Sequence, residues 1–147
     1  MTQPRNFGFD EETGMLKDAA QRFFEEKRPL EKMRPQLAGT EDPYHGSART
    51  VWFDQENWRE IQALGWHLLA VPEAVGGIGM GLVPATAIQE EIGRAACPTP
   101  LTGTLQSTFV LRAAEANTLL TRIAEGASMA LAIHGEDGSL EPGSTDV

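Results

Sequence analysis

Residues 128–134, near the end of the chain, alternate large and small side chains, which is the spacing of a β-strand. Met129, Leu131 and Ile133 would share one face of it. A single strand leaves its backbone hydrogen bonds unmade, and even an isolated hairpin is only marginally stable in water. We therefore predict that the rest of a sheet lies in chain following these 147 residues or in another subunit. The alternative is a disordered segment, or a coil packed on helices.

The rest of the chain has helical spacing, with apolar residues recurring every three or four positions. A first helix is expected to start after Asp10 and to kink or break near Pro29. A second, short helix is expected to start after Asp54 and to end at Gly65. Further helices are expected over 84–96, 103–116 and about 118–125, and residues 39–51 are expected to form an exposed loop. Along 84–96 the polar residues, Glu90 and Glu91 included, are placed off the apolar face. The sequence thus predicts a mainly α fold.

Charge and composition exclude several classes of protein. The chain has 12 Lys+Arg against 21 Asp+Glu, a net charge of −9, and no basic stripe, so we expect no nucleic-acid partner. No apolar run approaches the length of a membrane span, and the first residues do not resemble a secretory signal. A single cysteine, Cys97, excludes an intrachain disulfide and favours a cytoplasmic location.

The glycine-rich run at 76–81 partly matches a nucleotide-binding motif. Gly77 and Gly79 match the first two positions of the dinucleotide fingerprint, but Leu82 stands at the third. The run also follows a predicted helix rather than a strand. We therefore predict a tight turn that requires positive φ angles, rather than a phosphate-binding loop.

No cluster of chemically active side chains stands out. His45, His67 and His134 are far apart and have no metal-ligand spacing, and His134 alone is kept as a possible ligand contact. Cys97 has no base near it in sequence and is predicted to be a small buried residue. Glu90 and Glu91, adjacent on a helix, diverge by about 100° and would not act as paired acids. We predict no metal site and assign no catalytic residue.

Three segments nevertheless resemble a known family. They are Trp58–Trp66, then Val-Pro-Glu-Ala-Val-Gly-Gly-Ile-Gly at 71–79, then Glu-Glu-Ile-Gly-Arg at 90–94. Together they resemble the N-terminal helical domain of the flavin-dependent acyl-CoA dehydrogenases, and the resemblance covers roughly residues 10–134. It implies an N-terminal arm at 1–9 and a helical domain at 10–126. Residues 127–147 would then be the first strand and loop of a truncated middle β-domain.

The resemblance also implies a function. Members of this family bind FAD and oxidise acyl-CoA thioesters to 2,3-enoyl-CoA in fatty acid or lipid metabolism, with a glutamate removing the α-proton. That glutamate belongs to a C-terminal bundle absent here, so the chain would be an N-terminal part or a split subunit, inactive alone. Implied partners are the acyl-CoA substrate, further chains in a homo- or hetero-oligomer, and electron-transfer flavoprotein. The alternative function is a non-catalytic helical interaction module that completes a partner subunit.

Candidate site residues follow from the same resemblance. The acyl pocket would be walled by the helices at 84–96 and 103–116, with candidates Gln89, Leu101, Leu105 and Phe109. Ordinary packing between helices is an equally open role for each of them. The family's flavin-contacting Gly-Ser-Asp motif does not follow the strand here, where the chain reads His-Gly-Glu at 134–136. If the motif is displaced to 141–146, Gly143 and Ser144 are the matching flavin contacts, and if it is lost at His134, the chain holds none of them.

Overall fold

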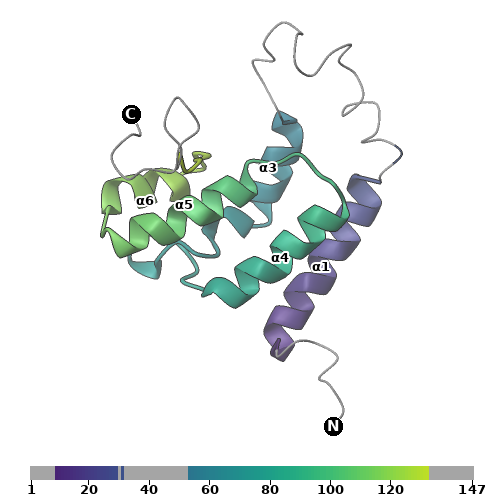
Figure 1. Cartoon of the computed structure of the whole chain (residues 1–147), viewed down its shortest axis with the longest axis horizontal. Coiled ribbons are helices and arrows are strands. Elements are labelled where there is room, and N and C mark those ends of the chain that lie inside the picture. Colours follow the sequence, from purple (N-terminus) through teal and green to yellow (C-terminus); the bar gives the residue numbers. More distant parts are fainter. Residues whose placement is uncertain (1–8, 30, 32–52, 133–147) are drawn as a thin grey trace, which may run out of the picture.

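The computed structural model describes residues 9–29, 31 and 53–132, and these residues are mainly helical, as predicted (Figure 1). Two short 3₁₀ helices, η1 and η2, connect α3 to α4. The elements in chain order are α1 Glu11–Lys27, α3 Gln55–Ala63, η1 Trp66–Leu68, η2 Glu73–Val75, α4 Leu82–Arg94, α5 Leu101–Ala113 and α6 Asn117–Ala124.

Local signals set the ends of the first two α-helices. Asp10 caps α1, because its carboxylate accepts the backbone N–H of Thr13 at 2.8 Å. Asp54 caps α3 in the same way, accepting from the Glu56 N–H at 2.9 Å. Gly65 follows α3 with φ +74°, a left-handed conformation that suits glycine after a helix end. These predicted caps and the predicted stop are confirmed, whereas the predicted loop at 39–51 lies outside the described residues.

The core lies between packed helices. Helices α1 and α4 lie side by side, α5 packs against α6, and both contact η1, which follows α3 (Figure 1). The Trp66 ring packs edge-on against Phe23 at 5.2 Å between ring centroids and lies 5.8 Å from the Phe24 ring. The buried core comprises Ala20, Phe24, Trp58, Ile61, Trp66, Leu69, Ala70, Ala85, Ile88, Ile92, Cys97, Leu101 and Leu105.

The segment after α6 corrects the strand prediction. Residues 127–132 form no strand, and Ile133 and His134 lie outside the described residues. Instead the Met129 N–H donates to the Thr104 hydroxyl oxygen at 3.1 Å, which holds the segment against α5. Because the described part of the chain contains no neighbouring strand, the Met129 backbone N–H bonds to a side chain of α5 rather than to another strand. A coil packed on helices, the alternative from the sequence, therefore describes residues 127–132.

Candidate functional site

The glycine-rich turn between η1 and α4 is a closed backbone structure. Gly76 and Gly79 have φ angles of +92° and +76°, which confirms the predicted need for positive φ. The backbone N–H groups donate to carbonyls of the preceding segment, Gly77 to Pro72 at 3.0 Å and Gly79 to Val71 at 2.8 Å. These donors are therefore not available to cradle a phosphate.

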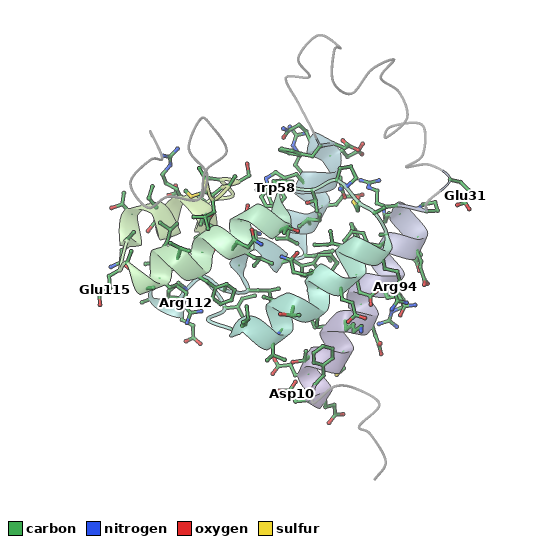
Figure 2. The ribbon with its side chains drawn as sticks, viewed as in Figure 1. Asp10, Glu31, Trp58, Arg94, Arg112 and Glu115 are labelled. Atoms are coloured by element: carbon green, nitrogen blue, oxygen red, sulfur yellow. The ribbon has the colours of Figure 1, made fainter. Side chains whose placement is uncertain are left out.

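Arg112, on α5, locks this turn in place (Figure 2). Its Nη1 atom donates at 3.0 Å to each of two carbonyl oxygens, those of Ala70 and Met80, on the two sides of the turn. Its guanidinium also lies 5.8 Å from the centre of the Phe109 ring. Sequence analysis missed Arg112, because both of its carbonyl partners lie more than thirty residues away in the chain.

The four candidate pocket residues all lie where α4 meets α5 or along α5 itself. Leu101, Leu105 and Phe109 recur every four residues and share one face of α5. Leu101 and Leu105 are fully buried in the core, and Phe109 is half-buried against it. Gln89 is also half-buried, and its Oε1 accepts the Thr102 hydroxyl at 2.7 Å, which ties α4 to α5.

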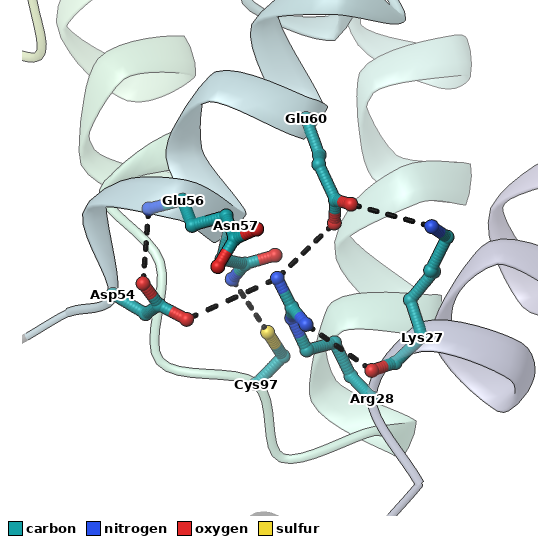
Figure 3. Close-up of polar contacts among 7 residues, drawn as sticks. All are labelled: Lys27, Arg28, Asp54, Glu56, Asn57, Glu60 and Cys97. Carbon is teal, nitrogen blue, oxygen red and sulfur yellow. Dashed lines mark hydrogen bonds and ion pairs between the residues drawn. The ribbon is translucent and has the colours of Figure 1, made fainter.

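A polar cluster joins the end of α1 to the start of α3 (Figure 3). Arg28 Nη2 lies 3.1 Å from Glu60 Oε2 and 3.9 Å from Asp54 Oδ2, and Arg28 Nη1 donates to the Lys27 carbonyl at 3.2 Å. Lys27 Nζ adds a contact of 3.3 Å to Glu60 Oε1. The Arg28 side chain is 18% exposed, so its ion pairs are better shielded from water than those of Lys27, whose side chain is 54% exposed.

Cys97 lies beside this cluster and is buried, as predicted. The Asn57 amide donates to its Sγ atom at 3.2 Å (Figure 3). Burial raises the pKa of the thiol above its ordinary value, against the opposing effect of the Asn57 hydrogen bond. A thiol held protonated in this way is a packing group rather than a nucleophile.

Glu91 corrects the prediction that the polar residues of this segment lie off the apolar face of α4. It is 2% exposed, whereas Glu90 is exposed. Arg94 Nε lies 3.3 Å from Glu91 Oε2. On α1, Lys17 Nζ lies 2.6 Å from Glu90 Oε2 and 3.8 Å from Glu91 Oε1. The two acids therefore hold the α1–α4 interface and do not form an acid pair.

His67, in η1, is a buried packing residue. Its ring meets Trp58 edge-on at 6.0 Å between centroids, and its Nδ1 atom has no hydrogen-bond partner among the described residues. Burial lowers the pKa of His67 below its ordinary value, and a backbone hydrogen bond at Ala124 opposes the shift. The folded chain therefore favours the neutral form of the ring.

This depressed pKa predicts a pH-dependent stability. Because the folded chain disfavours the charged ring, the contribution of His67 is complete above the ordinary pKa of 6.5 and is lost as pH falls toward the lower folded value. We expect the free energy of unfolding, measured by urea titration, to decrease from about pH 7 to about pH 5. In the His67→Gln variant the decrease over this window should shrink, and an unchanged slope would contradict the assignment.

Gly143, Ser144, His45 and His134 lie outside the described residues. Within residues 9–29, 31 and 53–132 no group of His, Cys, Asp and Glu is arranged to hold a metal ion. The helices of this same portion are all too short or too polar to cross a membrane.

Comparison with known proteins places residues 10–118 in the family model described as acyl-CoA dehydrogenase, N-terminal domain. Two curated relatives are both named acyl-CoA dehydrogenase IpdE2. The chain is 36% identical over 78 residues to the one from Mycolicibacterium smegmatis (strain ATCC 700084 / mc(2)155). It is 35% identical over 80 residues to the one from Mycobacterium tuberculosis (strain ATCC 25618 / H37Rv). Each alignment covers 52% of this chain and 25% of the relative, so the match spans about a quarter of the relatives' length. No solved structure matches the chain significantly.

Proposed function

The chain belongs to the acyl-CoA dehydrogenase family as its N-terminal domain, and we propose that it supplies a helical wall of the acyl pocket in a flavin-dependent acyl-CoA dehydrogenase. The observation that carries the proposal is the family match over residues 10–118, which includes both α4 and α5. The reaction would be α,β-dehydrogenation of an acyl-CoA thioester. The match to about a quarter of the relatives' length supports a role as one part of that enzyme.

The glycine-rich turn does not fit a flavin phosphate. The glycine-rich turn uses its N–H groups on its own backbone. The proposed flavin contacts Gly143 and Ser144 lie outside the described residues. We therefore propose that other parts of the enzyme supply most of the flavin contacts and the catalytic base.

The proposed wall is built from the four candidates on α4 and α5. Gln89 and Phe109, both half-buried, would form the part within reach of an acyl chain. Leu101 and Leu105 would form its inner side, since they are covered by neighbouring helices. The Thr102–Gln89 hydrogen bond and the Arg112 guanidinium beside Phe109 would hold the two ends of the wall in place.

The proposal predicts that the chain needs a second component. Purified alone, the 147-residue chain should show little or no flavin absorption and no dehydrogenase activity with a dye acceptor. Affinity-tagged chain purified from its native host should bring down a chain that carries flavin and base, and activity should appear in that complex. A complex lacking flavin and activity would favour the interaction module instead. A yellow, active protein from this chain alone would contradict the split-enzyme proposal.

Within that active complex, Phe109→Ala tests the wall itself. We expect the ratio of kcat/KM values between a short and a bulky acyl-CoA to change by about tenfold, because the ring limits the space for the acyl chain. The control is Leu119→Ala on α6, which removes an apolar side chain that is 38% exposed and is not one of the four wall residues. Equal effects of the two substitutions would contradict the assignment of Phe109.

A further inference from the structure

Arg112, near the C-terminal end of α5, differs from the other half-buried cations of the described residues (Figure 2). Lys17 and Arg28 are also half-buried, and both have carboxylate partners, Lys17 Nζ at 2.6 Å from Glu90 and Arg28 Nη2 at 3.1 Å from Glu60. Arg112 forms no ion pair with any described Asp or Glu, although the chain has a net charge of −9. It is therefore a partly desolvated cation that no described carboxylate neutralises.

Two backbone carbonyls and one aromatic ring fix the Arg112 guanidinium. Both N–H groups of Nη1 are in use, since this atom donates at 3.0 Å to the carbonyl oxygens of Ala70 and Met80. The guanidinium carbon lies 5.8 Å from the centre of the Phe109 ring. A side chain held in this way has already lost much of its rotamer freedom, so a ligand would not have to order it on binding.

The remaining donors of Arg112 form an unused fork. Nε and Nη2 make no hydrogen bond within the described residues, and both atoms keep surface open to solvent, unlike the enclosed Nε of Arg28. In a planar guanidinium these two nitrogens present parallel N–H bonds along one edge, which match the two oxygens of a carboxylate or a phosphate. Arg112 is thus a preorganised bidentate donor for an anion.

The surroundings of the fork favour a carboxylate on an apolar stem over a phosphate. The half-buried Phe109 ring packs beside the guanidinium, and Leu82, two residues after Met80, is 65% exposed. Apolar surface of this kind gains free energy when a hydrocarbon stem covers it. The net charge of −9 also opposes a doubly charged phosphate monoester more than it opposes a singly charged carboxylate.

We propose that the Nε–Nη2 edge of Arg112 is a binding site for an aliphatic carboxylate. One oxygen would accept from Nε and the other from Nη2, while Nη1 keeps its two carbonyls, so binding leaves the glycine-rich turn unchanged. Two sources share this chemistry, a free aliphatic acid and an acidic side chain of another polypeptide. This inference does not depend on the proposed enzymatic function, because it concerns donors that the isolated chain already presents.

The test follows the Arg112 Nε–H signal of the ¹⁵N-labelled 147-residue chain, assigned through bonds from the backbone. Sodium butyrate is titrated against sodium chloride at constant ionic strength. We expect a saturable shift of this signal with a Kd on the order of 10 mM. Arg59 and Arg122 are controls in the same sample, since both are exposed. They should bind butyrate at least about tenfold more weakly, because their side chains would have to be ordered on binding.

Three further probes define the ligand. Butyramide keeps the stem without the charge and should bind at least about tenfold more weakly than butyrate. Methyl phosphate tests the competing anion and should also bind more weakly. The α-amide of N-acetyl-L-glutamic acid presents the carboxylate as a protein side chain does. If it binds as tightly as butyrate or more tightly, the source is an acidic side chain of another polypeptide, and if it binds more weakly, the source is a free aliphatic acid.

Arg112→Lys then tests the fork itself, because lysine keeps the charge but has no bidentate edge. Butyrate binding, followed by the backbone amide signals of Phe109 and Met80, should weaken by about tenfold, the loss of one hydrogen bond between charged groups. Arg122→Lys on α6 is the matched control and should leave this binding unchanged. The dispersion of amide shifts shows whether each variant is folded, and if Arg112→Lys is not, the Nε–H signals of the unaltered chain decide.

Four results would overturn the proposal. They are no saturable shift at Arg112, equal affinities at Arg112 and the two exposed arginines, full binding by a folded Arg112→Lys variant, and binding of butyramide or methyl phosphate as tight as that of butyrate.

Discussion

The Gly77→Ala variant should lose about 3 kcal/mol or more of stability, or fail to fold. A Cβ atom built on Gly77 overlaps the carbonyl group of Val71, which is backbone and cannot swing away as a side chain can. The same carbonyl oxygen accepts the Gly79 N–H, so moving it breaks the turn that joins η1 to α4. The measurement is the free energy of unfolding from a urea titration followed by tryptophan fluorescence or circular dichroism.

Two other glycines provide matched controls for this substitution. Gly81 and Gly93 have open space where a Cβ would stand, and neither has a positive φ. Gly93→Ala lies within α4 and should stabilise the chain by about 0.5–1 kcal/mol, since glycine is a poor helix former. Gly81→Ala should change stability little. A loss for Gly77→Ala no larger than the change in these controls would contradict the close approach to Val71.

The second large effect is expected for Leu105→Ala, with a loss of about 3–4 kcal/mol. Leu105 is 1% exposed in the middle of α5 and belongs to the same core as Phe24 and Trp66. Truncating it removes buried apolar surface and leaves a cavity that rigid helices fill only partly. Urea titration of the isolated chain measures this without any substrate or cofactor.

Val110→Ala on the same helix is the control, because Val110 is 47% exposed and should contribute well under 1 kcal/mol. Comparing the two variants distinguishes between the two roles that the sequence left open for Leu105, lining the acyl pocket and packing in the core. A large loss of stability in the isolated chain identifies a packing residue, whatever it does in the assembled pocket. A Leu105→Ala variant as stable as Val110→Ala would show that the core does not depend on this side chain.

The features predicted correctly all rest on residues close together in sequence. Asp10 and Asp54 cap helices through N–H groups two or three residues away. Gly65 and Gly76 adopt the positive φ angles expected of them. The glycine-rich turn was also distinguished from a phosphate loop by local pattern, since the third glycine of the fingerprint is missing at Leu82.

The features that were missed depend on distant segments. Glu91 looked solvent-facing because helical periodicity describes only its own helix. Its burial arises from α1, which brings Lys17 to that side of α4 across 74 positions of sequence (91 − 17). Arg112 gave no local sign that it would bind two carbonyls more than thirty residues away. The alternation at 128–134 predicted a strand, but a strand forms only beside a neighbouring strand. In the described part, 128–132, Met129 instead hydrogen-bonds to Thr104 on α5.

The sequence by itself determined the helical class, the capped helix ends and the glycine turn. Through the three segments at 58–66, 71–79 and 90–94, it also indicated the family. These are set by backbone preferences and side-chain spacing within a few residues. The tertiary structure alone decided which polar side chains are buried, which face of α5 enters the core, and which two carbonyl groups hold Arg112. The burial and the partners of a side chain depend on which distant segments pack against it, and a short-range sequence pattern does not specify that packing.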